Sequence, residues 1–517
     1  MQKTFYNSIS HLLGGFFPLV MFLVLSPFLQ LRLGEDMFGV LLLLTSLINI
    51  GTVIDFGFGK AIVKFISEYY HTDKEKDLDH VINLSFIVFA IIGMLGLILI
   101  FVFSNFISTK LLKIPIDLQG YIVISLRLSG LVFFLNMLAS AIGSIFYALN
   151  KYILINSVNI ILNIIYTCLV LLFLSFGIKL NGLILLNMLI SVLSILVFII
   201  LIKRFLPKFS IRPIGFIKKH VVDLTHRKFS GEGRNNITSF KFLSFSFYSF
   251  THKIFLIATY HIDRLIIAST LGIGLVPFYA VPIQIIIALI KPLGRMTEVI
   301  IPIASELSAK GDWDQLKRKY LKASRLLCVL STSLFMPVVL FGNQIIYFWM
   351  GQVFANKAQF VIILTGLAYY IISFTGVISL IIDGVGRPKV NTVFVIIYTF
   401  LILAFIFPLT KKYGINGAAL SMLFASFYVP GMLFYCNKKI LKVEMGEYVK
   451  SVYKPIIIAV VMGCFYYVFN IHSKTVFDLV LVFVYSMVTY YLFCYLFKAI
   501  KKDEISLIRS LIFPVRL

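Results

Sequence analysis

The chain has 517 residues, of which 60% are hydrophobic and 13% charged, and its mean hydropathy is +0.98. This composition excludes an ordinary soluble globular protein and indicates an integral membrane protein. A net charge of +25 would indicate nucleic-acid binding in a soluble protein, so its distribution along the chain decides its meaning. The five cysteines all fall inside apolar runs, which argues against disulfides and thiolate metal sites.

Hydropathy predicts an all-α polytopic membrane protein with about fourteen transmembrane helices, each long enough for the roughly 20 residues that cross a bilayer core. The first span contains Pro18 and Pro27, is too long for the core of a signal peptide, and lacks a small-residue cleavage site, so we interpret it as retained. The predicted spans lie near residues 9–32, 38–58, 81–104, 120–148, 154–176, 182–202, 240–271, 277–301, 323–347, 358–382, 390–409, 417–436, 455–470 and 476–497.

The basic residues are distributed unequally between the predicted loops. If the N-terminus is cytoplasmic, roughly 34 of the 47 Lys and Arg residues lie on the inner side and about 8 outside. This asymmetry follows the positive-inside rule and predicts that both termini are cytoplasmic. The positive charge therefore mainly sets topology, with weak binding to anionic lipid as a by-product.

Asp55 ends the second predicted span and is followed by Gly57 and Gly59. The glycines resemble a nucleotide-binding loop only superficially, because no strand precedes them and no Walker motif occurs in the chain. We interpret the segment as a helix exit with a loosened backbone and keep Asp55 as a candidate for ion coupling or gating. Without an ATP site, the protein is not expected to be a primary pump.

Four landmarks recur in the same order at an offset of about 235 to 238 residues, which predicts a duplicated six-span unit. Because six is even, the copies form two parallel six-helix bundles, related by a pseudo-two-fold axis along the membrane normal and facing a central cavity. Two extra C-terminal helices fall outside the duplication. The recurring landmarks are Leu33-Gly34 with Leu271-Gly272, Ser67-Glu68 with Ser305-Glu306, Asn150-Lys151 with Gly386-Arg387, and residues 177–182 with 414–417.

The predicted domains are an N-lobe over 1–202, a basic cytoplasmic linker over 203–239, a C-lobe over 240–436, and the last two spans with a cytoplasmic tail over 437–517. The linker contains prolines and glycines, which favours a flexible tether over a regulatory site. The outer loops are short, so they leave no extracytoplasmic domain in which to build an enzyme.

The seventh and eighth predicted spans carry many charges for their depth. The seventh contains Lys253, His261, Asp263 and Arg264, and the eighth contains a further set of three charged residues. Each charge costs about 2.5 to 3.5 kcal/mol near a helix centre facing lipid, so these groups must face something polar. The charged residues of the eighth span are Lys291, Arg295 and Glu298.

Helical spacing groups these charges into two stripes. Lys291, Arg295 and Glu298 share one helix face, and Lys253 and Arg264, eleven residues apart, nearly eclipse each other. The cations outnumber the acids, so the predicted lining favours an anion, and a diphosphate matches forked guanidinium and ammonium donors. Arg127, about two turns into the fourth span, adds a cation from the first half.

The acids and the histidine admit two interpretations. Asp263, Glu298 and His261 are candidates for ion coupling or gating, but ion pairs and hydrogen bonds that only hold helices together would account for the same residues. Arg295 and Glu298 also lie toward the inner interface, where long side chains reach water easily.

Prolines inside predicted spans are candidate hinges, because each removes a backbone hydrogen bond and kinks its helix. They are Pro18, Pro27, Pro282 and Pro292. Pro292 directly follows Lys291, so a bend there would move the charged face, which suits alternating access.

Together these features resemble Wzx-like O-antigen and polysaccharide flippases, the polysaccharide-transport branch of the multidrug/oligosaccharidyl-lipid/polysaccharide exporter superfamily, whose fold is MATE/MurJ-like. The resemblance covers nearly the whole chain. The motifs that carry it are the Leu33-Gly34 turn with Gly39, the Asp55-Phe56-Gly57 end of the second span, the Ser-Glu segments, and the Gly-Ile-Asn-Gly turn at 414–417.

The resemblance implies a flippase, not an enzyme, that needs no cofactor. It would move an undecaprenyl-diphosphate-linked oligosaccharide, such as an O-antigen or capsule repeat unit, across the bacterial inner membrane by alternating access coupled to an H⁺ or Na⁺ gradient. The implied partners are the lipid-linked oligosaccharide, the coupling ion, membrane lipids, and the polysaccharide polymerase and chain-length machinery, with no nucleic acid. The diphosphate and sugar would lie on the cationic lining while the prenyl tail stays in lipid.

Three alternatives stay open. A lipid II flippase of the same superfamily also handles a prenyl diphosphate. A multidrug exporter of cationic compounds would be expected to have an acidic, aromatic cavity, whereas this lining is basic. A membrane glycosyltransferase or ligase would be expected to have larger outer loops with clustered acids or arginines.

Overall fold

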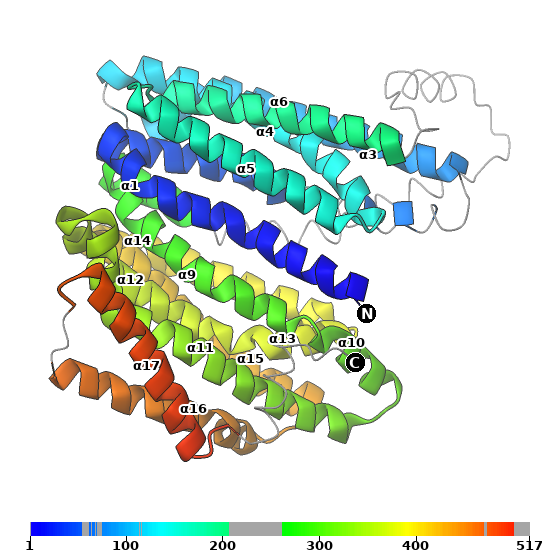
Figure 1. The fold of residues 1–517 in the computed structure, drawn as a ribbon, viewed down its shortest axis with the longest axis vertical. Coiled ribbons are helices and arrows are strands. Elements are labelled where there is room, and N and C mark those ends of the chain that lie inside the picture. Colours follow the sequence, from blue (N-terminus) through cyan, green and yellow to red (C-terminus); the bar gives the residue numbers. More distant parts are fainter. Residues whose placement is uncertain are drawn as a thin grey trace. The chain divides into compact units, whose positions relative to one another are not determined.

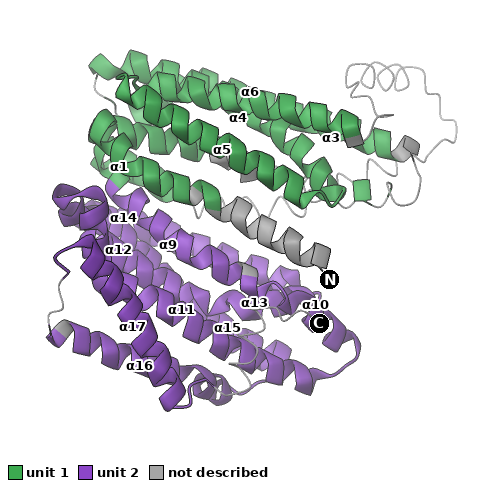
Figure 2. Cartoon of the chain, viewed as in Figure 1, with its two compact units in different colours: residues 1–277 green, residues 278–517 purple. Residues whose placement is uncertain are grey.

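A computed structural model describes residues 2–53, 62–63, 65–67, 69, 75–112, 114, 116–205, 261–469 and 473–500 of the chain. Throughout these residues the regular structure is helical (Figure 1). The chain divides into two compact units, residues 1–277 (unit 1) and 278–517 (unit 2), which Figure 2 distinguishes by colour.

Unit 1 is a bundle of long helices. Helices α3 and α4 pack side by side, as do α1 and α5, and α4 also packs on α6. A further helix over 261–271 is the last helix of the unit before the short 3₁₀ turn η2. The labelled elements are α1 (Gln2–Val53), α3 (Glu75–Phe106), the π-helical turn η1 (Ile107–Leu111), α4 (Ile116–Ala148), α5 (Tyr152–Ser175), α6 (Leu180–Phe205) and η2 (Ile273–Leu275).

Unit 2 is organised around one long helix, α11 (Trp313–Met350), which packs on α12 (Gln352–Ser373), α16 (Met445–Val468) and α17 (Val476–Leu496). Phe341 of α11 meets Tyr466 of α16 edge to face, and the buried Tyr490 of α17 belongs to the same apolar cluster. The remaining elements are α9 (Val276–Thr297), α10 (Ile300–Ala309), α13 (Thr375–Gly384), α14 (Pro388–Ser426), α15 (Tyr428–Cys436) and η3 (Asn437–Leu441).

Ten helical segments among the described residues are long and apolar enough to cross a membrane. One of them, Pro388–Leu441, has 54 residues. At 1.5 Å per residue it would extend about 80 Å, more than twice the roughly 30 Å of a bilayer core, so it must turn back. The break lies at Gly414, whose φ is 61°. The all-helical, multi-pass prediction is confirmed, while the total of fourteen spans stays a prediction.

Three of the four predicted repeat landmarks share an unusual backbone geometry. Gly34 and Gly272 have φ of 77° and 100°, and Gly177 and Gly414 have φ of 76° and 61°. At the third landmark, Asn150 (φ 57°) corresponds to Gly386 (φ 79°). Positive φ is the region in which glycine and, next, asparagine are tolerated, so the same turns recur in both copies. The parallel arrangement of the two bundles stays a prediction.

The boundary between the units lies after Pro277, whereas the predicted C-lobe begins at 240. The reason is that the helix over 261–271 and η2 pack on α1 of unit 1. The predicted linker, 203–239, lies outside the described residues except for its first three positions, which complete α6. The predicted lobe boundaries therefore stay predictions.

The packing of η2 on α1 depends on glycine at two places. A Cβ atom on Gly39 would lie 2.2 Å from the carbonyl oxygen of Ile273, and a Cβ atom on Gly274 would lie 2.5 Å from a carboxylate oxygen of Asp36. Both distances are shorter than van der Waals contact. The two glycines therefore let the turn approach the helix closely enough to form one wall of the pocket described below.

Replacing Gly39 by alanine should destabilise unit 1, because the new methyl group meets backbone that cannot move without displacing η2. We expect a loss of about 1 to 3 kcal/mol, the usual cost of overpacking. Gly120→Ala in α4 is the matched control, since nothing lies within 4 Å of its added Cβ and alanine favours helix. Thermal unfolding of both variants in detergent tests this, and equal melting temperatures would contradict it.

Candidate functional site

A buried guanidinium lies within unit 1. Arg264, in the helix over 261–271, is 7% exposed, and its Nη1 donates a hydrogen bond of 2.7 Å to Oγ of Ser46 in α1. Ser46 Oγ in turn donates to the carbonyl of Leu42 at 2.8 Å, so the serine is held in place by its own helix. The contact joins segments 218 residues apart in the chain.

Asp263 does not neutralise this cation by a direct ion pair. Its carboxylate, 5% exposed, accepts a hydrogen bond of 2.7 Å from the backbone N–H of Arg264. Nε of Arg264 is buried and finds no hydrogen-bond partner in the described part of the chain. A buried charged group normally has a full set of partners, so this arginine retains donor capacity for an anion or ordered water.

His261 lies one turn before Arg264 on the same helix and is half-buried. Its Nδ1 atom is buried and, among the described residues, has no hydrogen-bond partner. The structure therefore brings Arg264, Asp263 and His261 into one short helical segment, as their positions in the sequence require. The contact with Ser46 adds a partner that the sequence analysis did not identify.

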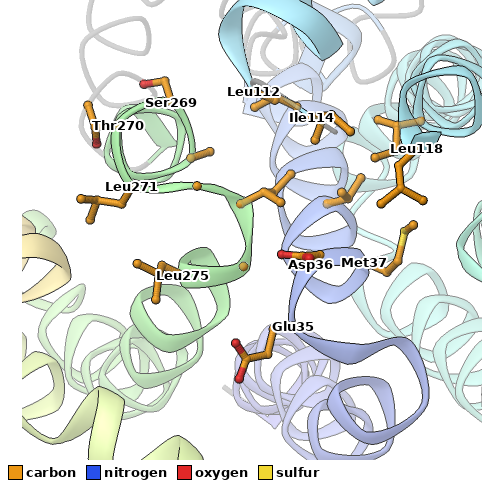
Figure 3. Close-up of a pocket in the computed structure, with 16 residues that line it drawn as sticks. Glu35, Asp36, Met37, Leu112, Ile114, Leu118, Ser269, Thr270, Leu271 and Leu275 are labelled. Carbon is orange, nitrogen blue, oxygen red and sulfur yellow. The ribbon is translucent and has the colours of Figure 1, made fainter. Parts of the chain in front are cut away.

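A pocket of about 380 Å³ opens in the same unit (Figure 3). It lies between the part of α1 that follows the break at Gly34, the segment leading into α4, and the turn at η2. Figure 3 shows the carboxylates of Glu35 and Asp36 on the side of α1 that faces the turn at η2. Leu112, Ile114 and Leu118 form an apolar side of the pocket. The pocket thus has an acidic side and an apolar side.

The pocket and the buried arginine belong to the same pair of helices. Ala268 lines the pocket one helical turn from Arg264, and Val40 lines it six residues from Ser46. At 1.5 Å per residue these separations are about 6 Å and 9 Å along the helices. The Arg264–Ser46 contact therefore lies one to two helical turns beyond the pocket residues Val40 and Ala268. Glu35 and Asp36 lie at the opposite end of the pocket.

Arg127 is placed differently from Arg264. Its Nε donates to Oγ of Ser104 in α3 at 3.3 Å, and its Cζ lies 4.5 Å from the ring centroid of Phe101. The rest of its surroundings is an apolar recess of about 500 Å³. A cation stacked on an aromatic ring is stabilised without a counter-ion, so this arginine serves the contact between α3 and α4 in the described structure.

The remaining predicted site residues lie in unit 2 or outside the residues that the structure describes. Lys291 and Glu298 are exposed, and each takes part in further interactions. Lys253 and Asp55 lie outside the described residues, as does the side chain of Arg295.

All four predicted hinge prolines lie inside helices, Pro18 and Pro27 in α1, and Pro282 and Pro292 in α9. Pro282 is buried and Pro292 is half-buried. Whether they act as hinges stays a prediction.

Sequence reasoning did not single out Glu35, Asp36 or Ser46 as site residues. The signal for the two acids was available, because they directly follow Gly34, one of the repeat landmarks. No comparable signal existed for Ser46, since a serine in an apolar helix most often bonds only to its own backbone.

Comparison with solved structures defines the class of fold. A structure of the lipid II flippase MurJ in an inward closed conformation superposes with a TM-score of 0.73 over 95% of this chain and 98% of that one, at 15% identity. An inward-facing multidrug resistance MATE family transporter of the MOP superfamily gives 0.63 over 83% and 94%, at 12% identity. The chain has the MurJ/MATE-like fold of multi-pass membrane transporters.

The family is defined by the sequence itself. Residues 1–308 match the family described as "Polysaccharide biosynthesis protein", and the chain belongs to this family. The family match and the MurJ/MATE-like fold confirm the resemblance found in the sequence.

Two further proteins are similar to this chain in sequence. A putative O-antigen transporter of Shigella flexneri is 21% identical over 420 residues, 80% of this chain and 93% of that protein. The uncharacterized membrane protein EpsK of Bacillus subtilis (strain 168) is 25% identical over 356 residues, 68% of this chain, and the match spans 65% of the length of that relative.

Replacing Ser46 by alanine should weaken the placement of Arg264, because the buried guanidinium loses its hydrogen-bond acceptor. We expect a loss of stability of about 1.5 to 3 kcal/mol, the range for hydrogen bonds to charged groups. Ser85→Ala is the matched control, because that buried serine also donates to its own helix, to Val81 at 2.6 Å, and belongs to α3. Thermal unfolding that lowered both variants equally would show that Ser46 does not hold the cation.

Proposed function

We propose that this protein is a flippase for an undecaprenyl-diphosphate-linked oligosaccharide, of the O-antigen or capsule repeat-unit type. It moves this lipid from the inner to the outer leaflet of the bacterial cytoplasmic membrane by alternating access, driven by an H⁺ or Na⁺ gradient. Family membership and the putative O-antigen transporter among its relatives support this class of cargo.

The single observation that carries the proposal is the buried Arg264. A guanidinium at bilayer depth is costly unless it faces a polar group, and within the described residues it makes one side-chain hydrogen bond, to Ser46. Its open donor positions suit an oxyanion, and a diphosphate offers several acceptor oxygens to a forked donor. Lys291, Arg295 and Lys253 stay proposed members of the lining, whereas Arg127 bonds to Ser104 and stacks on Phe101.

The glycan needs a different chemistry from the diphosphate. Glu35 and Asp36 are hydrogen-bond acceptors when ionised, and sugar hydroxyls are donors. The pocket that they line lies one to two turns from Arg264 along the same helices. We propose that sugar hydroxyls contact these carboxylates while the diphosphate is near the arginine.

Ion coupling is assigned to the acids and the histidine. Asp263 adjoins Arg264 in the chain, so a change in its protonation would alter the field at the anion site directly. Glu298, Asp55 and His261 are the further candidates. The proposed topology has both termini in the cytoplasm, and the proposed partners are the coupling ion, membrane lipids, and the polymerase and chain-length machinery of polysaccharide synthesis.

A lipid II flippase is the second candidate, because a flippase of that cargo has the same fold as this chain. A shared fold at 15% identity does not show which of two prenyl diphosphates, differing only in their sugars, is the cargo. A multidrug exporter has the fold as well, but its cationic cargo would be repelled by Arg264. The identity of glycans accumulated on the inner leaflet in a strain lacking this protein distinguishes the first two.

Replacing Arg264 or Lys291 by alanine should abolish surface polysaccharide in a strain that lacks its own flippase, with normal protein abundance. The reason is that each change removes a cation proposed to hold the diphosphate. Lys179→Ala is the control, since Lys179 is exposed in the turn between α5 and α6 and should complement fully. Normal surface polysaccharide in both site variants would remove them from the site.

The coupling ion is tested by collapsing one gradient at a time. If a proton drives transport, an uncoupler should stop it while a sodium ionophore alone has little effect, and Asp263→Asn should lower the rate at every pH. The measurement is the appearance of the lipid-linked oligosaccharide in the outer leaflet. Insensitivity to both reagents would leave only downhill movement and contradict the assignment of a driving ion.

A further inference from the structure

A charged groove of about 890 Å³ lies in unit 2, between the first turns of α11 and the segment that leads into α16. Nine of its eleven lining residues are charged. The cations are Lys317, Arg318, Lys322, Arg325, Lys442 and Lys450, the acids are Asp314, Glu444 and Glu447, and the others are Leu321 and Ser451.

Helical spacing explains why these residues meet. On α11 the lining positions 314, 317, 318, 321, 322 and 325 follow the three- and four-residue spacing of a single helix face. On α16 and the residue before it, positions 444, 447 and 451 repeat the same pattern. The two charged faces line a common groove because α11 and α16 pack together along their length.

The balance of charge in the groove is positive. Six cations face three acids, and Lys317 pairs with Asp314 at 3.4 Å, which accounts for one residue of each sign. Among all the lining residues the cations exceed the acids by three positive charges. Lys322 and Arg325 are half-buried, so their charges are less screened by water than those of a fully exposed patch.

The groove lies where both helices change from polar to apolar. Tyr320 and Tyr448 stack at its base with ring centroids 5.8 Å apart, and both are buried. Two turns further along α11, Cys328 contacts the backbone of Val452 at 3.5 Å. Beyond this point α11 has no charged residue, and α16 has none after Lys454. A change of this kind on two packed membrane helices marks the level of the lipid head groups.

The predicted repeat shows which of these cations are specific to one copy. At the offset of 238 residues, Lys317, Arg318, Lys322 and Arg325 correspond to Asp79, His80, Leu84 and Ile87 in the first copy. The first copy has its lysines, Lys74 and Lys76, at positions that correspond to Asp312 and Asp314. Both copies therefore carry positive charge in this segment, but only the second copy carries it along the helix face that lines the groove.

We propose that this groove is a binding site for an anionic phospholipid of the surrounding leaflet, separate from the transport site. The phosphate lies among Lys322, Arg325 and Lys450, and the acyl chains extend from there into the membrane. The excess of three positive charges favours a head group with two phosphates, as in cardiolipin, over one with a single phosphate. The bound lipid holds α16 against α11.

The test compares lipid binding to the purified full-length protein and to a groove variant, Lys322→Gln, Arg325→Gln and Lys450→Gln. The matched control, Lys389→Gln, Lys438→Gln and Lys439→Gln, removes three exposed cations outside the groove. Retention of cardiolipin, phosphatidylglycerol and phosphatidylcholine is measured by native mass spectrometry, and affinity by thermal shift on titration with each lipid.

Cardiolipin should be retained in preference to phosphatidylcholine, and the groove variant should bind it at least about 10-fold more weakly while the control changes by less than about 3-fold. A charge-keeping variant, Lys322→Arg, Arg325→Lys and Lys450→Arg, should bind cardiolipin, which shows that loss is not caused by misfolding. Equal loss in the groove and control variants would overturn the proposal. So would retention of a polyprenyl diphosphate without any anionic phospholipid.

Discussion

The hydrogen bond between Arg264 and Ser46 is the interaction on which the site in unit 1 depends. It places a guanidinium among apolar helices, where a charge is stable only if its donors are used. Because Asp263 bonds to backbone instead, the cation keeps capacity for a further acceptor. The same contact attaches the helix over 261–271 to α1, so one side chain both joins elements 218 residues apart in the chain and defines the proposed anion site.

Glycine makes this arrangement possible. Gly34 and Gly272 turn the chain in backbone regions that other residues avoid, while Gly39 and Gly274 let η2 approach α1 to within contact of its backbone. The turn at Gly34 recurs at Gly272, and the turns at Asn150 and Gly177 recur at Gly386 and Gly414, so the predicted repeat keeps its backbone geometry where side chains differ. The clearest difference is the groove beside α16, which is lined by cations at positions that are not basic in the first copy.

Arg127 and Arg264 show why site prediction was only partly possible. Both are arginines at membrane depth, and both were assigned to one lining from sequence. In the structure Arg264 is buried against Ser46, whereas Arg127 bonds to Ser104 and stacks on Phe101 in an apolar recess. Charge and depth are properties of the sequence, but the partner of a long side chain depends on which helix lies beside it.

Hydropathy by itself determined that this is an all-helical membrane protein, because a bilayer leaves no alternative way to satisfy the backbone of long apolar segments. The offset of its glycines likewise predicted a duplication, since turns with positive φ tolerate few other residues. Only the tertiary structure decided that Ser46 meets Arg264, that Glu35 and Asp36 line a pocket, and that α11 and α16 share a basic groove. Those contacts join residues far apart in the chain, and helix packing, not local sequence, selects them.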